Sequence, residues 1–394
     1  MTVTKFIPYG RQSINEDDIA AVVESLNSDY LTQGPKVHEF ERQLADKVGA
    51  DYALACNSAT SALHLACLAL GVTQGDSVWT SPNTFIASAN CARYCGAEVD
   101  FVEIDQHSYN LCPEQLAKKL ALAAREDKLP KVVIPVHFAG QPCDMAAIHQ
   151  LTQQYGFAII EDASHAIGAY YQDQPVGNCQ YSDICVFSFH PVKIITSAEG
   201  GMAVTNDPKL AQHMRTHGHQ GTTKNPQELT QIPGDWYYEQ QALGYNYRMT
   251  ELQAALGLSQ LKRLDEFIAR RHQQFDHYQQ LLKGLPITLP KQKGDAKSSL
   301  HLYPILLPAQ HATKRKGVFD ALRQAGIGTQ VHYIPVHSQP YYQALGFKLG
   351  DYPIAEDYYA RTLSLPLFAD LSFEEQVYTA HALSKALADN GVIL

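Results

Sequence analysis

The sequence predicts an α/β fold in which a mainly parallel sheet is covered by helices on both sides and a second, smaller α/β domain follows. Between residues 51 and 207, short apolar or β-branched runs alternate with amphipathic stretches. Several of these runs are apolar on both faces, which is typical of strands in a parallel sheet between two helical layers. A chain of 394 residues with 45% hydrophobic content can also bury more than one core.

The predicted sheet begins with a strand that ends near Cys56. Six further strand-like runs follow, namely SVWTSP (77–82), EVDFVEI (98–104), KVVIPVHF (131–138), FAIIEDAS (157–164), DICVFSF (183–189) and GMAVTND (201–207). Helical segments separate them, and SATSALHLACLAL (58–70) and PEQLAKKLALAA (113–124) are the clearest of these. Together these elements predict the larger domain.

The second half of the chain begins with a polar stretch, 217–245, which predicts a long surface loop. A helical pattern then runs from Thr250 to about Leu282 and predicts one long linking helix. The remainder mixes strands with helices, namely LYPILLP (302–308), GTQVHYIP (328–335), TLSLP (362–366) and helices near 314–324 and 373–387. We therefore predict a large domain over residues 1–250, and a linking helix with a small C-terminal domain over 251–394.

Composition excludes several classes of function. The net charge of −9, with acidic and basic residues interspersed, gives no basic stripe for nucleic acid. The eight cysteines lack zinc-site spacing and are interpreted as reduced core thiols, and no metal site is predicted among the histidines. No signal peptide and no apolar stretch of membrane-spanning length is found, so a cytoplasmic location without membrane contact is expected.

An anion site is predicted where the strand near Cys56 gives way to a helix. Small residues, Ser58, Ala59 and Thr60, open this helix. The unpaired N–H groups of a first helical turn and the helix dipole favour an anion, and small side chains let the backbone approach it. Ser188 can add a hydroxyl, so a phosphate group is the expected occupant.

Two other strand ends carry side chains suited to an aromatic ring. Phe85 follows a strand and a Pro-Asn turn, so its face can stack on a ring at the same sheet edge. Glu161, Asp162 and His165 lie at the end of an apolar strand, where a carboxylate at Asp162 can keep a pyridine nitrogen protonated. Two adjacent carboxylates after apolar strand residues need partners, because their desolvation is costly.

Lys193 lies between two strand-like runs and is flanked by apolar Val192, Ile194 and Ile195. Burial lowers the pKa of a lysine, and a partly neutral amine can form an imine with an aldehyde and later act as a base. Taken alone, these features have plainer explanations: a helix N-cap, a core phenylalanine, a capping aspartate and a surface lysine. Together they indicate a pyridoxal phosphate enzyme in which Lys193 carries the cofactor as a Schiff base.

Nine motifs across nearly the whole chain resemble those of the DegT/DnrJ/EryC1/StrS family of sugar-nucleotide aminotransferases. They are YLTQG at Tyr30, NSATSAL at Asn57, SHAIG at Ser164, FSFHPVK at Phe187, TSAEGG at Thr196, NYRM at Asn246, LGLSQL at Leu256, HLYPI at His301 and QVHYIPV at Gln330. The chain is most similar to the pseudaminic acid branch, which also shares Ala59 in place of a frequent Gly and His165 in place of a frequent Gln. The resemblance implies the fold of aspartate aminotransferase, type I among pyridoxal phosphate enzymes, with a seven-stranded sheet.

The resemblance also implies roles for matched residues. Lys193 would hold the cofactor, Asp162 would pair with its ring nitrogen, and Phe85 would stack on its ring. Asn246 would reach the cofactor of a neighbouring subunit, so that a homodimer shares its active sites. The other implied cofactor contacts are Ala59, Thr60, His165 and Ser188. The residues implied for the sugar side are Tyr9, Asp29, Tyr30, Leu31, Thr32, His332, Tyr333, Ile334 and Pro335.

The implied reaction moves the amino group of L-glutamate to the C4 ketone of a UDP-linked 2-acetamido-2,6-dideoxy sugar, on the way to pseudaminic acid. Other acceptors stay open, such as a GDP- or dTDP-linked keto-sugar or a 3-keto group. The dehydrase offshoot of the family lacks the cofactor lysine, so the presence of Lys193 argues against it. A non-catalytic regulator that binds pyridoxal phosphate is the rival of another class, and no DNA-reading segment supports it.

Overall fold

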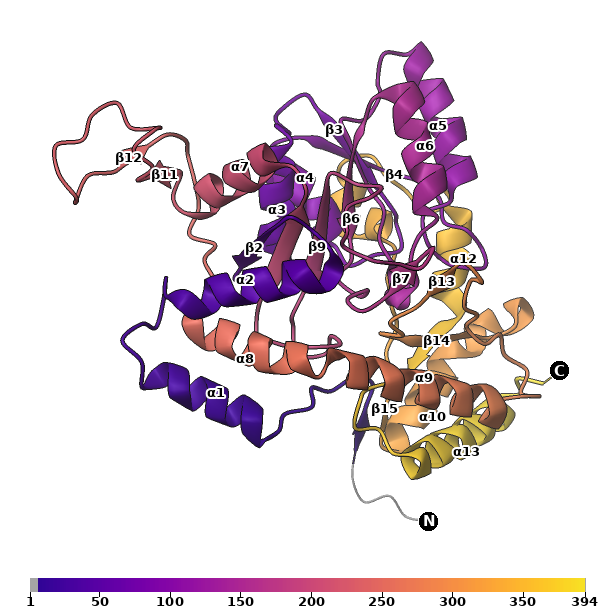
Figure 1. Cartoon of the computed structure of the whole chain (residues 1–394). Helices are drawn as coiled ribbons and strands as arrows, with labels where there is room; N and C mark the ends of the chain where they lie inside the picture. Colours follow the sequence, from indigo (N-terminus) through magenta and orange to yellow (C-terminus); the bar gives the residue numbers. More distant parts are fainter. Residues whose placement is uncertain (1–5, 394) are drawn as a thin grey trace.

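The computed structural model describes residues 6–393, and a seven-stranded sheet forms the centre of its larger domain (Figure 1). In spatial order the strands are β2 (Tyr52–Cys56), β10 (Gly201–Thr205), β9 (Ile184–Ser188), β6 (Ala158–Asp162), β5 (Val132–Ile134), β3 (Ser77–Thr80) and β4 (Glu98–Phe101). Within this sheet β10 pairs antiparallel with β2 and β9, and the other pairs are parallel. The predicted seven-stranded, mainly parallel sheet is therefore confirmed.

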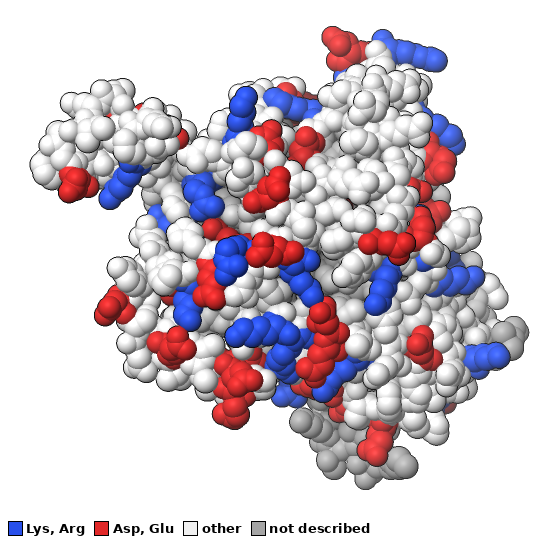
Figure 2. Space-filling view, viewed as in Figure 1, with Lys and Arg blue, Asp and Glu red and all other residues white. Residues whose placement is uncertain are grey.

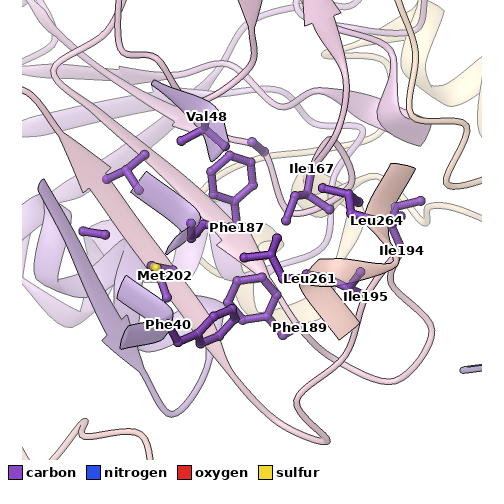
Figure 3. Close-up of a cluster of buried hydrophobic side chains, with 14 of the residues drawn as sticks. Phe40, Val48, Ile167, Phe187, Phe189, Ile194, Ile195, Met202, Leu261 and Leu264 are labelled. Carbon is purple, nitrogen blue, oxygen red and sulfur yellow. The ribbon is translucent and has the colours of Figure 1, made fainter. Parts of the chain in front are cut away.

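Helices cover both faces of the sheet, because consecutive apolar strand residues point to opposite faces. In β9, Val186 packs into a core with one helical layer, and Phe187 packs on the opposite face against Phe40 and Leu261 (Figure 3). The first layer contains α3 (Ala59–Ala69), α4 (Ala87–Tyr94) and α7 (Pro208–Gly218). The opposite layer contains α2 (Pro35–Val48), α5 (Pro113–Arg125), α6 (Met145–Tyr155) and α8 (Glu251–Lys262), and α1 (Glu16–Leu26) packs on α8.

The prediction of one continuous helix from Thr250 to about Leu282 was wrong. The chain forms α8, which Thr250 caps, and then α9 (Leu264–Leu281), with a break at Arg263. The Arg263 guanidinium bonds Asp18 Oδ2 at 3.1 Å, a long-range contact that helical periodicity cannot reveal. Leu264 and Phe267 of α9 lie in the core of the large domain, whereas Phe275 and Tyr278 lie in the core of the small domain. Helix α9 is thus the element that crosses between the two cores.

The small domain is built on two short strand pairs. Strand β14 (Tyr303–Leu306) runs antiparallel to β16 (Thr362–Leu365), and β1 (Ile7–Pro8) runs parallel to β15 (Ile327–Gly328). Its helices are α10 (Arg315–Gln324), α11 (Pro340–Gln343), α12 (Pro353–Arg361) and α13 (Phe373–Asp389). The strand predicted over 328–335 was wrong beyond Gly328, because the later residues leave the sheet and contribute to the wall of a cavity. The division at residue 250 stays a prediction.

The polar stretch predicted as a surface loop forms a projecting arm. Helix α7 ends at Gly218, and β11 (Thr222–Thr223) pairs antiparallel with β12 (Glu239–Gln240) at the base of the arm, on the left in Figure 1. The arm shows few charges in Figure 2, and the side chain of Trp236 is 74% exposed. On the rest of that face acidic and basic side chains are interspersed.

The remaining elements are short. They are β7 (Tyr170–Tyr171), β8 (Gln174–Pro175), β13 (Ala296–Lys297) and the 3-10 turns Phe138–Gly140, Ala309–Lys314 and Val336–Ser338. None of the helices found between residues 6 and 393 has the length and apolar character that crossing a membrane requires.

Candidate active site

A cavity of about 400 Å³ lies where several strands of the large sheet meet residues of the small domain. The predicted site residues that line it are Tyr9, Ala59, Thr60, Phe85, Asp162, His165, Ser188, Lys193, His332 and Tyr333. These residues are far apart in the sequence. The sheet brings most of them together because Cys56, Asp162 and Ser188 end their strands at the same edge, as the sequence predicted.

The first turn of α3 forms one wall of the cavity. Ser58 caps the helix by accepting a bond from the Ser61 N–H at 3.1 Å, and the first helical bond runs from Ala62 N–H to Ser58 O. The N–H groups of Ala59 and Thr60 come before that bond and are available to an anion. Gly201 of β10 makes this close packing possible, because a Cβ there would lie 2.5 Å from Ala59 Cα.

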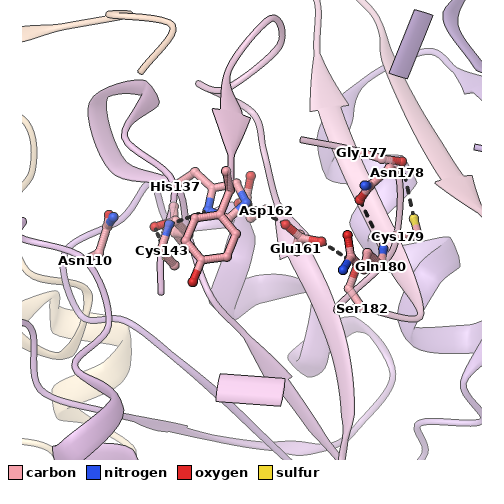
Figure 4. A network of polar contacts seen from close by, with 12 residues as sticks. Asn110, His137, Cys143, Glu161, Asp162, Gly177, Asn178, Cys179, Gln180 and Ser182 are labelled. Carbon is pink, nitrogen blue, oxygen red and sulfur yellow. Dashed lines mark hydrogen bonds and ion pairs between the residues drawn. The ribbon is translucent and has the colours of Figure 1, made fainter. Parts of the chain in front are cut away.

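The two carboxylates at the end of β6 face opposite ways, and each has partners. Asp162 lines the cavity, and its Oδ2 accepts a bond from Ser88 Oγ at 2.6 Å. Glu161 accepts bonds from Ser182 Oγ at 2.5 Å and from His137 Nε2 at 2.7 Å (Figure 4). The Cys143 N–H donates to His137 Nδ1 at 3.1 Å, so Nε2 is the ring nitrogen that donates to Glu161. These hydrogen bonds offset the desolvation cost of the two buried carboxylates, for which the sequence analysis expected partners.

Lys193 lies in the loop between β9 and β10, with its side chain at the cavity. Its N–H donates to His190 O at 2.9 Å in a tight turn, while Ile194 and Ile195 are buried in the adjoining core. Burial lowers the pKa of Lys193 to about 8, although the negative charge of Asp162 acts in the opposite direction. A substantial fraction of the amine is therefore neutral near pH 8, as a nucleophile requires.

Three buried histidines lie at the cavity wall: His165 and His332 line the cavity, and His301 lies behind His165. The Ala139 N–H donates to His165 Nδ1 at 3.3 Å, so the neutral ring carries its proton on Nε2, which lies 3.1 Å from Tyr333 Oη. The ring of His301 lies 4.4 Å from that of His165. Burial lowers the pKa of His165 and His301 well below the usual range and that of His332 to about 3. This wall is therefore neutral and polar at physiological pH.

Phe85 lines the cavity. Its side chain is 56% exposed, and its ring centroid lies 6.3 Å from that of Tyr333. A core role, the plainer explanation for a phenylalanine, does not fit such exposure. The exposed ring face is available to a planar group in the cavity.

Several residues implied for the site lie outside the cavity of their own chain. Asn246 follows the projecting arm, where its backbone forms an isolated bridge with His219. The segment 29–32 is exposed and is tied to the start of α8, where the Glu251 N–H donates to Leu31 O. Ile334 and Pro335 continue past Tyr333 without lining the cavity. Their roles stay predictions.

The cavity also contains residues that the sequence did not indicate. They are Leu63, Thr84, Ala87, Val136, Ser164, His190, Val192, Glu199 and Gly200. Thr84 and Ser164 directly adjoin the predicted residues Phe85 and His165, so proximity along the chain was the signal for them. Ser88 and His301 act from behind the cavity wall through contacts that follow from the tertiary structure alone.

The donor set at this cavity fits pyridoxal phosphate. Helix N–H groups and the Ser188 hydroxyl suit a phosphate, Asp162 suits a protonated ring nitrogen, and Lys193 suits an aldehyde. Between residues 6 and 393, no group of three His, Cys, Asp or Glu side chains is placed to hold a metal ion.

Known proteins resemble the chain over nearly all its length. The model of the DegT/DnrJ/EryC1/StrS aminotransferase family matches residues 12–384. The spore coat polysaccharide biosynthesis protein SpsC of Bacillus subtilis is 41% identical over 94% of both chains. The UDP-4-amino-4,6-dideoxy-N-acetyl-β-L-altrosamine transaminase of Campylobacter jejuni is 36% identical over 97% of both.

Two solved structures share the fold closely. Helicobacter pylori PseC, an aminotransferase involved in the biosynthesis of pseudoaminic acid, has a TM-score of 0.90 and 34% identity, over 98% of this chain and 100% of that one. The PLP form of a putative sugar aminotransferase, Spr1654 from Streptococcus pneumoniae, has a TM-score of 0.88 and 30% identity, over 98% and 99%.

Proposed function

Because the chain belongs to the DegT/DnrJ/EryC1/StrS aminotransferase family, we propose that it moves the amino group of L-glutamate to C4 of a UDP-linked 2-acetamido-2,6-dideoxy-4-keto-hexose. The coarser activity is established: the chain is a pyridoxal phosphate-dependent sugar aminotransferase, as its motifs predicted. The UDP sugar, the C4 position and glutamate are the proposed refinements.

The proposal rests on one observation, the placement of Lys193, Asp162 and the first turn of α3 around a single cavity. When bound, the cofactor supplies an electron sink for the electron pair left at a substrate carbon. In the proposed roles, the Ala59 and Thr60 N–H groups and Ser188 hold its phosphate, and Asp162 keeps its ring nitrogen protonated. Phe85 covers its ring.

Lys193 is the proposed proton carrier as well as the attachment point. Since its pKa is about 8, the free amine can take a proton from the substrate carbon bearing nitrogen and return one during the second half of the exchange. In the proposed roles, Tyr333, His165 and His332, which line the cavity, offer neutral hydrogen-bonding groups to sugar hydroxyls. Tyr9, whose ring centroid lies 5.2 Å from that of His332, is proposed to contact the sugar ring.

Completion of the site by a second copy of the chain is also proposed. Asn246 does not line the cavity of its own chain, and it follows an arm with exposed apolar residues such as Trp236. A homodimer would cover such residues and bring Asn246 to the partner's cofactor. The segment 29–32 and residues 334–335 are proposed to contact the nucleotide sugar in the assembled site.

The choice of acceptor draws on the relatives. The Campylobacter relative is named for a UDP-linked 4-amino sugar and the Helicobacter structure for pseudoaminic acid, which favours a UDP-linked 4-keto acceptor. The Bacillus relative, at higher identity, is named for spore coat polysaccharide. Turnover should therefore be compared on UDP-, GDP- and dTDP-linked keto-sugars, and a preference for the last two would replace the proposed acceptor.

The proposed attachment of the cofactor to Lys193 can be tested by trapping that bond chemically. Borohydride reduction of the holoenzyme should fix the cofactor on the peptide that contains Lys193, and Lys193→Ala should abolish turnover. A label on another lysine, or an active Lys193→Ala protein, would overturn the assignment.

A further inference from the structure

Thr84, Ser88 and Asp162 form a chain of hydrogen bonds at the cavity wall. Ser88 Oγ lies 2.6 Å from Asp162 Oδ2, and the Oγ1 atom of Thr84 lies 2.8 Å from Ser88 Oγ. The other carboxylate oxygen, Oδ1, accepts a bond from the Ser164 N–H at 3.0 Å. The three linked side chains are buried, so water does not readily replace these bonds.

The direction of each bond follows from the number of protons available. An ionised carboxylate only accepts hydrogen bonds, so Ser88 donates its single hydroxyl proton to Asp162. The Phe85 carbonyl is a weaker alternative for that proton at 3.3 Å. Thr84 is then the donor to Ser88. Two hydroxyl dipoles in succession point toward the carboxylate, and this arrangement stabilises its negative charge.

The three residues lie on two elements that both reach the cofactor cavity. Asp162 ends β6, whereas Thr84 and Ser88 lie in the turn before α4 and in its first turn. Phe85 belongs to the same turn and lines the cavity. One short segment therefore presents the aromatic ring and also fixes the carboxylate on which the ring nitrogen would depend.

We propose that Ser88, supported by Thr84, is a positioning residue that keeps Asp162 ionised and oriented toward the ring nitrogen of bound pyridoxal phosphate. The inference rests on the proposed function, because it assumes that Asp162 meets that nitrogen. Both hydroxyls belong to the hydrogen-bonded chain that ends at Asp162, and in the proposed role they act through it.

The test compares Ser88→Ala with the conservative Ser88→Thr and with a control, Thr80→Val. Thr80 is equally buried, but its hydroxyl donates to the Ile134 carbonyl at 2.8 Å and not to a carboxylate. Two quantities are measured: the affinity of the apoenzyme for pyridoxal phosphate, and the visible absorbance of the holoenzyme as a function of pH.

Ser88→Ala should weaken cofactor affinity by about tenfold, the size of one lost charge-assisted hydrogen bond, and should displace the pH profile of the absorbance. Ser88→Thr should restore both quantities, Thr84→Val should give a smaller change in the same direction, and Thr80→Val should match the wild type. A folded Ser88→Ala protein with wild-type affinity and pH profile would overturn the proposal.

If Ser88→Ala does not fold, Thr84→Val alone tests the proposal, because it removes only the hydroxyl that bonds Ser88. An unchanged absorbance profile in that variant would also overturn the proposal. Failure of the proposed function is distinguishable, since borohydride would then leave no cofactor on the Lys193 peptide of the wild-type protein.

Discussion

The imidazole of His165 and the phenol of Tyr333 lie nearly parallel, at an angle of 19°, with Nε2 and Oη 3.1 Å apart. His165 follows a strand of the large domain, whereas Tyr333 lies in a segment that enters from the small domain. This contact joins the two domains at the cavity. It also holds the two polar side chains in a fixed orientation in the cavity wall.

Loss of this contact should affect the sugar half of the reaction. Tyr333→Phe removes one neutral hydrogen bond, worth about 1 kcal/mol, so kcat/KM for the keto-sugar should fall several-fold while affinity for pyridoxal phosphate changes little. Tyr341→Phe is the matched control, because Tyr341 is an exposed tyrosine away from the cavity. Equal losses in the two variants would contradict a specific role for Tyr333.

Cofactor uptake should depend on pH through Lys193. The neutral amine is the nucleophile and its pKa is about 8, so the rate at which apoenzyme takes up pyridoxal phosphate should rise about tenfold per pH unit below pH 8 and level off above it. Stopped-flow absorbance measures this rate. A rate that does not vary between pH 6 and 9 would mean that the amine is not the titrating group.

His332 should make the protein less stable in acid. Its pKa is about 3 when folded and near 6.5 when unfolded, so unfolding takes up a proton between these values. Stability therefore falls as the pH drops through this window. The His332→Gln variant should take up one proton fewer on unfolding than the wild type. Its Tm should therefore decline less steeply between pH 6 and pH 4. An identical slope in both proteins would show that His332 is protonated when folded.

Glu251 should stabilise the fold by binding the backbone N–H groups at the start of α2. Its buried carboxylate accepts bonds from the N–H groups of Gly34, Lys36 and Val37 at 3.1, 2.8 and 3.2 Å. Glu251→Ala should lower the free energy of unfolding by about 3 kcal/mol, measured in urea. Glu24→Ala is the control, since its exposed ion pair with Lys36 should contribute less than about 1 kcal/mol. Similar losses would refute this role.

A shared active site can be tested by mixing variants. Lys193→Ala and Asn246→Ala proteins should each be impaired, but a heterodimer of the two would contain one site with both defects and one site with none. Mixing after mild dissociation should therefore recover activity. If both residues served the cavity of their own chain, every site in the heterodimer would keep one defect, and no activity would return.

The parts of the site that the sequence predicted are those set by local patterns. Apolar runs located the strands, and because parallel strands end at one edge, Ala59, Asp162 and Ser188 were expected together. Ser88 and His301 were not predicted, because their role depends on which side chain lies opposite, and no spacing in the sequence encodes that. The helix break at Arg263 was missed for the same reason.

Helix α9 has a consequence for how substrates reach the cavity. Its eighteen residues run without interruption from one core into the other. The helix is therefore a rigid connection between the two domains, and no hinge lies within it. Swinging the small domain aside would pull Leu264 and Phe267 out of their packing. Entry of a substrate should therefore depend more on side-chain and loop rearrangements near the cavity, such as at Phe85, than on a swing of the small domain.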